Sequence, residues 1–166
     1  MRPSIFFLTA WLALTSVVVA RAEDPAVAGW TERIRLLPSD LELAAKLDSG
    51  AENSSLHVEK QRLFRRGDKR WVRFTVEGDD GRRVALERPL IRKAAIRRHS
   101  GKSDVRPVVA IKVCLGSTVR EVEVNLVDRS GFGYPILIGR SFVEGEFLID
   151  VSRQDIVPLA CEEASD

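Results

Sequence analysis

The sequence predicts an all-β protein, a closed or nearly closed barrel with one short helix near the C-terminus. Three observations support this fold class. Segments that alternate apolar and polar residues, or that are rich in Val, Ile and Leu, recur along most of the chain. Turn signals such as Gly78-Asp79-Asp80-Gly81 separate them. A helical pattern occurs only at Ser141 to Gly145, which is typical of a small β-barrel.

The first 22 residues are expected to be a signal peptide and not part of this fold. Arg2 supplies a positive charge, Ile5 to Ala20 an apolar core, and Ala20-Arg21-Ala22 a small-x-small cleavage site. An uncleaved anchor is the alternative, although the apolar stretch is shorter than the about 20 residues that a bilayer requires. The sequence therefore predicts a periplasmic or secreted protein with no membrane attachment after cleavage.

The rest of the chain divides into a mobile lead-in at 23–29, a folded domain at 30–157 and an acidic tail at 158–166. Alternation and β-branched residues mark each expected strand, and Gly or Pro residues mark the turns between them. In chain order, the expected strands are 30–37, 41–47, 55–64, 71–77, 83–87, 90–96, 105–115, 119–127 and 147–151. The pairs 55–64 with 71–77 and 105–115 with 119–127 are expected to form hairpins.

An aspartate in a small-residue turn follows the apolar strand at 41–47. The segment Asp48-Ser49-Gly50-Ala51 has what an aspartic protease requires, namely a carboxylate at a strand end, a neighbouring hydroxyl and a glycine that admits the substrate backbone. By itself the triplet is a weak signal, and an ordinary turn that closes a strand is the more frequent reason for it. Pro135 to Val143 adds a second signal, because an apolar run there leads into Gly139-Arg140 and the short helical pattern.

Together these segments resemble the retropepsin-like aspartic endopeptidases of bacteria, a family long labelled putative ATP-dependent zinc proteases. The resemblance covers about residues 30 to 151. It is carried by Asp48 to His57, Trp71-Val72-Arg73-Phe74, Arg106-Pro107-Val108-Val109, Val127-Asp128-Arg129-Ser130 and Leu137-Ile138-Gly139-Arg140. The resemblance implies a retropepsin-like closed barrel in which the apolar-Gly-Arg segment packs beneath the catalytic turn.

The resemblance also implies that Asp48 is the catalytic residue. Two carboxylates about 3 Å apart must share one proton, since like charges that close cannot both ionise. A second catalytic triplet is absent, because Asp128-Arg129-Ser130-Gly131 carries an extra residue. Activity therefore requires a homodimer to which each copy contributes Asp48.

Several neighbours of Asp48 are expected to support the site. Ser49 would donate hydrogen bonds across the dimer axis, Gly50 would offer its carbonyl to the substrate main chain, and Ala51 would lie against the substrate. Gly139 belongs to the segment beneath the turn. Glu52 and Arg140 are expected to form an ion pair below the active site. The alternative for Arg140 is an exposed cation at the start of the helix.

The substrate contacts are less closely defined by the resemblance. His57, Arg106 and Arg129 are candidate substrate-binding residues, with a structural role as the alternative for His57. A flap hairpin is expected at about 78–101, although this stretch is unusually basic and lacks the glycine-rich tip of viral flaps.

Positive charge is concentrated in residues 60–106, which contain sixteen Lys or Arg residues and only six Asp or Glu residues. Such an excess can attract an acidic, glutamate-rich peptide or another anionic polymer. The alternative is that alternating strands place Arg on their wet faces. Aromatic residues are sparse there and lie in no nucleic-acid-binding motif, so no nucleic-acid partner is predicted.

No cofactor or metal is predicted. There is no His-Glu-x-x-His, His57 and His99 stand far apart with no ligand spacing, and there is no phosphate-binding loop. A metal held between subunits remains the alternative. Cys114 and Cys161 could form a disulfide in an oxidising compartment, or Cys114 could be a buried apolar residue.

The sequence thus predicts an exported aspartic endopeptidase that hydrolyses peptide bonds with an aspartate pair formed across a homodimer. The alternative is a non-catalytic module of the same fold that binds anionic peptides or polymers.

Overall fold

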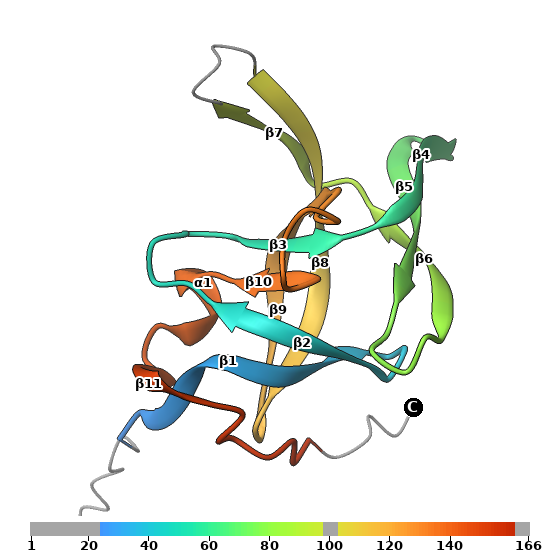
Figure 1. The fold of residues 1–166 in the computed structure, drawn as a ribbon. Coiled ribbons are helices and arrows are strands. Elements are labelled where there is room, and N and C mark those ends of the chain that lie inside the picture. Colours follow the sequence, from blue (N-terminus) through green and yellow to red (C-terminus); the bar gives the residue numbers. More distant parts are fainter. Residues whose placement is uncertain (1–23, 98–102, 162–166) are drawn as a thin grey trace, which may run out of the picture.

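A computed structural model describes residues 24–97 and 103–161. The expected signal peptide lies outside these residues. Within them the chain is almost entirely strand, arranged as a barrel with a smaller sheet on one side (Figure 1). No described helix is long and apolar enough to cross a bilayer. The all-β prediction is confirmed.

The larger sheet has eight strands in the order β11-β1-β2-β10-β3-β9-β8-β7, and an additional pairing of β1 with β8 closes six of them into a barrel. Its strands are β1 (Ala26–Leu37), β2 (Leu41–Leu47), β3 (Ser54–His57), β7 (Arg92–Arg97), β8 (Ser103–Leu115), β9 (Thr118–Val127), β10 (Ile136–Ile138) and β11 (Phe147–Gln154). The one described helix, α1 (Arg140–Val143), lies between β10 and β11.

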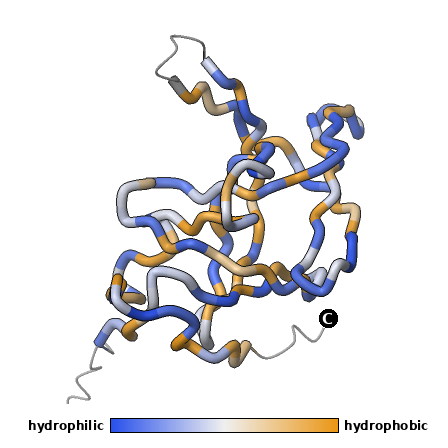
Figure 2. The backbone as a smooth tube through the Cα atoms, in the orientation of Figure 1, coloured by the Kyte–Doolittle hydropathy of each residue, from blue (hydrophilic) through white to orange (hydrophobic). Residues whose placement is uncertain are grey.

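The smaller sheet contains β4 (Glu59–Arg66), β5 (Lys69–Glu77) and β6 (Arg83–Pro89), all antiparallel. Val72, Phe74 and Val76 on one face of β5 are buried and belong to the same core as the barrel. Figure 2 shows that hydrophobic and hydrophilic residues alternate along much of the backbone. Because successive side chains of a strand point to opposite faces, this alternation places the hydrophobic ones on one face. The bulkiest fully buried side chains are Phe74, Phe142, Ile34, Leu36, Leu41, Leu43, Leu56, Ile111, Leu115, Leu126, Ile136 and Ile138.

The expected elements differ from the structure most clearly at two places. The strand predicted at 55–64 is divided at Val58, so that β3 pairs with β9 and β10 in the barrel while β4 pairs with β5 in the smaller sheet. Residues 26–29, expected as a lead-in, are strand because they pair in parallel with β11. Ala28 there is fully buried. Alternation alone could not reveal either difference, since both depend on distant partners.

The range expected for a flap hairpin coincides only in part with a projecting hairpin of the structure. β7 and the first part of β8, residues 103–108, form an antiparallel pair that projects from the barrel, and the residues between them, 98–102, lie outside the described residues (Figure 1). The expected range 78–101 therefore includes β7 but misses β8. It also includes β6, which pairs with β5 instead.

The chain beyond β11 is fastened to the barrel. Glu32 is fully buried, and its carboxylate accepts backbone N–H groups from Gly29, Ile156 and Val157 over 2.6, 3.2 and 3.1 Å. Burial removes water from the Glu32 carboxylate, and these three N–H groups supply the hydrogen bonds that water would otherwise make. The Ala160 N–H then donates to the Gly116 carbonyl over 2.9 Å.

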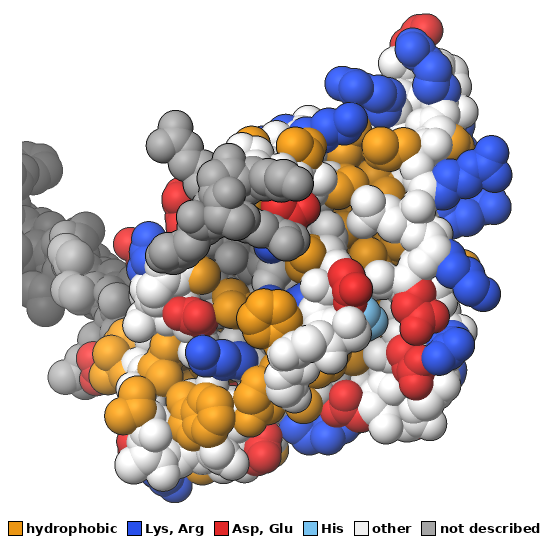
Figure 3. All heavy atoms as spheres, turned by 45° about the horizontal axis from the view of Figure 1, so that its top comes forward, with side chains coloured by type: hydrophobic (Ala, Val, Ile, Leu, Met, Phe, Trp, Pro, Cys, Tyr) orange, Lys and Arg blue, Asp and Glu red, His pale blue; other side chains and the backbone are white. Residues whose placement is uncertain are grey.

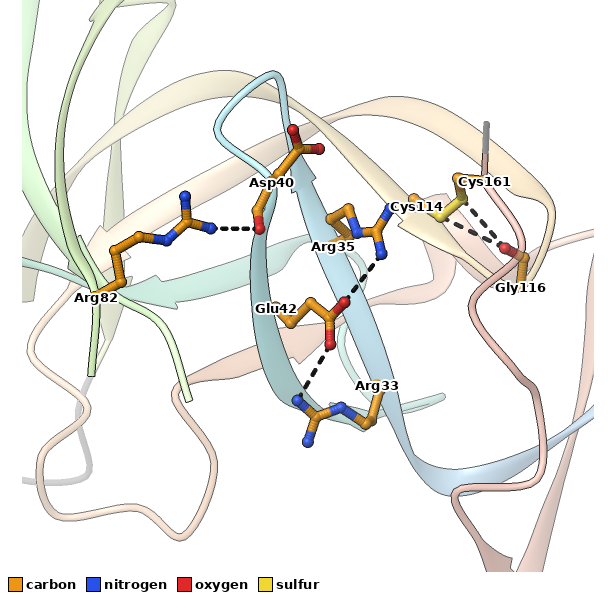
Figure 4. A network of polar contacts seen from close by, with 8 residues as sticks. All are labelled: Arg33, Arg35, Asp40, Glu42, Arg82, Cys114, Gly116 and Cys161. Atoms are coloured by element: carbon orange, nitrogen blue, oxygen red, sulfur yellow. Dashed lines mark hydrogen bonds and ion pairs between the residues drawn. A yellow bond between two sulfur atoms is a disulfide. The ribbon is translucent and has the colours of Figure 1, made fainter. Parts of the chain in front are cut away.

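A disulfide joins Cys114 at the end of β8 to Cys161, with the two Cα atoms 6.3 Å apart (Figure 4). This answers the question that the sequence left open. The same view shows Glu42 of β2 between Arg33 and Arg35 of β1. Its Oε2 lies 3.4 Å from Nη2 of Arg33, and its Oε1 lies 2.9 Å from Nη2 of Arg35. Beside them Arg82 donates to the Asp40 carbonyl over 2.7 Å and so ties the segment before β6 to the β1–β2 turn.

The disulfide should contribute measurably to stability, because it closes a loop with a sequence separation of 47. Replacing Cys161 with Ser is expected to lower the free energy of unfolding by about 2–4 kcal/mol, measured by urea denaturation. A reductant should destabilise the native protein by a similar amount and leave the Cys161→Ser variant unchanged. Equal stability of the two oxidised proteins would contradict the prediction.

Candidate active site

The candidate catalytic carboxylate lies at the end of a strand buried in the barrel. β2 is held between β1 and β10, and Leu43, Ala45 and Leu47 on its inner face are buried. Asp48 is the next residue, and its N–H donates to the Ile138 carbonyl over 2.9 Å. The sheet pairing thus continues up to Asp48 and fixes the position of its backbone.

The turn after Asp48 is closed by short hydrogen bonds. The Gly50 N–H donates to Oδ1 of Asp48 over 2.9 Å, and the Ala51 N–H donates to the Asp48 carbonyl over 3.3 Å. The other carboxylate oxygen, Oδ2, lies 3.8 Å from Nζ of Lys46, and the Asp48 side chain is 29% exposed. The carboxylate is therefore anchored through one oxygen and partly open to solvent.

Gly139 lies against the backbone of this active-site turn. A Cβ atom added at Gly139 would come within 2.7 Å of the Glu52 carbonyl oxygen and of the Asn53 carbonyl carbon. No side chain fits there, so a glycine is required. The Gly139 N–H donates to Oγ of the buried Ser54 over 3.2 Å. Gly139 therefore packs against the turn as expected.

The two residues after Gly139 also hydrogen-bond to the active-site turn. The Arg140 N–H donates to the Ala51 carbonyl over 2.8 Å, and the Ser141 N–H donates to the Glu52 carbonyl over 3.0 Å. These are the first N–H groups of α1, which have no partner inside the helix. The active-site turn thus supplies the acceptors that the helix start needs, and each segment holds the other.

The predicted ion pair between Glu52 and Arg140 is wrong for this chain. Nη1 of Arg140 donates to the Ser49 carbonyl over 2.8 Å, and no ion pair joins it to Glu52. The Glu52 side chain is exposed and bonds to the site only through its backbone carbonyl. The Arg140 guanidinium instead donates a hydrogen bond to the Ser49 carbonyl and so stabilises the turn.

Two hollows meet at the Asp48 carboxylate, because Trp30, Lys46 and Asp48 line both of them. The larger, of about 720 Å³, is lined otherwise by Leu47, Ser49, Arg140, Val143, Glu144, Phe147, Leu148, Ile149 and Val151. The smaller, of about 340 Å³, is lined otherwise by Arg129, Phe132, Gly133, Tyr134 and Leu137. Asp48 therefore lies at the junction of a mainly apolar groove and a smaller hollow that contains a buried arginine.

Arg129 is the candidate substrate residue that the structure brings into this cleft. It is only 7% exposed, and Nη1 donates to Oγ of Ser55 over 2.8 Å while Nε donates to the Tyr134 carbonyl over 3.2 Å. Burial and the positive charge of Arg106 lower the pKa of Arg129 from its ordinary value, and the attraction of Asp48 opposes them. The guanidinium remains a cation at neutral pH.

His57 and Arg106 occupy supporting places. The Arg129 N–H donates to Nδ1 of His57 over 2.8 Å, so the imidazole holds the backbone of the buried arginine. Arg106 is paired with Asp104 at 2.9 Å and adds positive charge near Arg129. Neither residue lines the two hollows at Asp48.

The lining residues that escaped the sequence analysis include Lys46, Trp30, Tyr134 and Phe132. Lys46 could have been found, because it precedes Asp48 by two residues and a strand places alternate residues on one face. Trp30 and Tyr134, whose rings meet edge to face at 5.8 Å, and the exposed Phe132 carry no sequence signal of this role. Within the described residues 24–97 and 103–161, no group of three or more His, Cys, Asp or Glu side chains is placed to hold a metal ion.

Comparison with known proteins supplies the family. Residues 27–159 match the RimB-like family, described as retropepsin-like aspartic endopeptidase RimB. Proteins named probable alpha-L-glutamate ligase are similar as well. Those of Shewanella pealeana and Desulfotalea psychrophila are 34% and 33% identical to the chain over 67% and 68% of its length. The chain spans only 25% of the length of each.

A solved structure shares the fold. It is protein Lpg0085 of Legionella pneumophila, of unknown function, with a TM-score of 0.70 and 31% identity over 80% of this chain and 98% of that one. The barrel, the aspartate turn and the glycine packed against it agree with the family match, which extends over most of the folded domain. The chain therefore belongs to the RimB-like family of retropepsin-like aspartic endopeptidases.

Proposed function

We propose that this protein is an aspartic endopeptidase that hydrolyses peptide bonds with two copies of Asp48, one from each subunit of a homodimer. The observation that carries the proposal is the position of Asp48. Its carboxylate stands on a turn held by Gly139 and Arg140 and faces the junction of two hollows. A rigid turn of this kind keeps a reacting carboxylate in place without reorganisation during the reaction.

In the proposed mechanism, one carboxylate of the pair accepts a proton from the attacking water while the protonated partner donates to the carbonyl oxygen of the scissile bond. The proton shared by the pair makes both roles available at once. Gly50 has no side chain and is exposed, so the substrate backbone can approach its carbonyl. One chain provides one such aspartate, hence the need for a second copy.

The surface around Asp48 suits a second copy of the chain. Ser49 is exposed, and its hydroxyl makes no hydrogen bond to any described residue. β11 is an edge strand of the large sheet, with Leu148 and Val151 59% and 80% exposed beside the apolar groove at Asp48. Exposed apolar groups at a sheet edge favour pairing with another chain. A dimer made here would cover them and bring the two Asp48 turns together.

The charge of the cleft supports a preference for acidic substrates. Arg129 is buried within the smaller hollow, Lys46 lines both hollows, and Arg106 contributes positive charge nearby. A guanidinium in a partly dry site binds a carboxylate more strongly than it does in water. We therefore extend the proposal to peptides rich in Glu or Asp.

The disulfide between Cys114 and Cys161 supports a further part of the proposal, that the protein works in the periplasm or outside the cell. Disulfides form and persist in oxidising compartments. The ligase name of the relatives refers to proteins about four times as long as the matched segment, and no ligase activity is proposed for this chain.

Replacing Asp48 with Asn should abolish hydrolysis of unstructured peptides at mildly acidic pH, because an amide cannot take the proton from the water. The rate should fall by a factor of about 10³ or more while thermal unfolding stays close to that of the native protein. Asp68→Asn, an equal change in an exposed turn, is the control and should retain activity. If the Asp48 variant still cleaves peptides, the protein is no aspartic peptidase of this kind, and a binding module becomes the better account.

Replacing Val151 with Asp should separate dimerisation from folding. Val151 is 80% exposed, so the variant should fold normally yet elute as a monomer in size-exclusion chromatography and lose hydrolysis, since a monomer has half of the acid pair. Val119→Asp, at a residue 45% exposed on β9, is the control and should stay dimeric and active. A monomeric Val151 variant with full activity would contradict the shared site.

The preference for acidic substrates can be tested at Arg106. Arg106→Gln should lower the ratio of kcat/KM for an acidic peptide to that for a neutral one by about threefold, because one cation near the cleft is lost. Lys112→Gln, an exposed change on β8 away from the cleft hollows, should leave the ratio unchanged. The native ratio should also fall as salt is raised. A ratio that responds to neither change would show that charge does not select the substrate.

A further inference from the structure

The outer face of the smaller sheet carries an unusual arrangement of arginine and aromatic side chains. Because Val72 and Phe74 of β5 are buried in the core, the alternating residues Trp71 and Arg73 face outward. On the neighbouring strand, Phe64 pairs with Trp71 and Arg62 pairs with Arg73. The outward face of the β4–β5 hairpin therefore gathers bulky aromatic rings and cations in adjacent positions.

The rings hold two of the guanidinium groups over their faces. The Arg66 guanidinium lies 4.4 Å from the centre of the Trp71 ring and 5.5 Å from that of Phe64, and the Arg73 guanidinium lies 5.9 Å from that of Phe64. The Phe64 and Trp71 rings are themselves 6.5 Å apart. Such stacking limits the freedom of long side chains and keeps their N–H groups directed for binding.

Positive charge on this face exceeds negative charge. Arg66 and Arg73 both pair with the same carboxylate, that of Glu87 on β6. Arg62 and Lys69 make no ion pair with any described residue. In the hairpin Arg62 lies across from Arg73, and Lys69 lies across from Arg66. Arg62, Phe64 and Arg73 line a hollow of about 220 Å³. The face thus has more guanidinium and ammonium groups than carboxylates to satisfy them.

This face is separate from the candidate active site. The Asp48 turn follows the end of β2, on the left of Figure 1, whereas the β4–β5 hairpin projects on the right. In Figure 3 Lys and Arg side chains gather at the upper right of the view, on the side of the smaller sheet. None of the residues lining the hollows at Asp48 comes from β4 or β5.

We propose that the outer face of the β4–β5 hairpin, formed by Arg62, Phe64, Arg66, Lys69, Trp71 and Arg73, binds an acidic polypeptide segment of a partner protein. Guanidinium groups bind carboxylates through paired hydrogen bonds, and here several stand in a row along an extended hairpin. Glu87 shows how a carboxylate can bind to this face, because its carboxylate pairs with both Arg66 and Arg73. An acidic segment would supply the carboxylates that Arg62 and Lys69 lack.

A nucleic acid fits this face less well. Proteins that bind single strands stack bases on exposed aromatic rings. Here the guanidinium groups of Arg66 and Arg73 already lie against Trp71 and Phe64. The arrangement favours hydrogen bonding to acidic groups over base stacking, and the repeated carboxylates of an acidic polypeptide match it.

The test uses the mature protein with Asp48→Asn, so that the probe is not cleaved and the result does not depend on the proposed peptidase activity. The probe is a fluorescein-labelled peptide that repeats Glu-Gly-Asp-Ser, followed by fluorescence anisotropy at low salt. Arg62→Gln with Arg73→Gln should weaken binding about tenfold, roughly threefold for each cation lost. Glu87→Gln should strengthen binding about threefold, because it frees two guanidinium groups. The control, Arg153→Gln on exposed β11, should change nothing.

The gain expected for Glu87→Gln separates binding from a merely structural effect, since loss of a structural ion pair would not tighten a complex. The proposal is overturned if the probe does not bind, if the double variant binds it as well as the parent, or if Arg153→Gln weakens it equally. A labelled oligothymidine that binds more tightly than the peptide, and loses binding in the double variant, would overturn the choice of an acidic polypeptide and assign the face to nucleic acid.

Discussion

The close contact between Gly139 and the backbone of Glu52 and Asn53 is the constraint on which the rest of the site depends. Any side chain at that position would overlap main-chain atoms that hydrogen bonds hold in place. The contact lets the start of α1 give its free N–H groups to the active-site turn. Two segments nearly ninety residues apart in sequence thereby stabilise one another, and Asp48 is placed mainly by hydrogen bonds between backbone atoms.

The Asp48 turn, held by Gly139 and Arg140, lies beside exposed apolar residues. The barrel leaves Ser49, Leu148 and Val151 exposed on the same side as the Asp48 carboxylate. Arg140, expected to pair with Glu52, instead fastens the Ser49 carbonyl.

The basic interval of the sequence serves several purposes once it is folded. Arg82, Arg83 and Arg92 show that several arginines of this interval are already engaged by acidic groups or carbonyls. Arg106 contributes to the field of the cleft, whereas Arg66 and Arg73 belong to the hairpin on the other side of the molecule. Net charge within a stretch of sequence therefore says little until the strands assign each cation to a face.

The sequence by itself determined the fold class, the aspartate turn after 41–47 and the glycine that packs against that turn. The first two depend on local signals, namely residue alternation and small residues in turns, whereas the packing of Gly139 was implied by the family resemblance of its segment. The tertiary structure alone decided the break at Val58, the pairing of 26–29 with β11, the bond between Cys114 and Cys161 and the burial of Arg129. These depend on which distant segments become neighbours, and a pattern read along the chain contains no information about contacts made across the barrel.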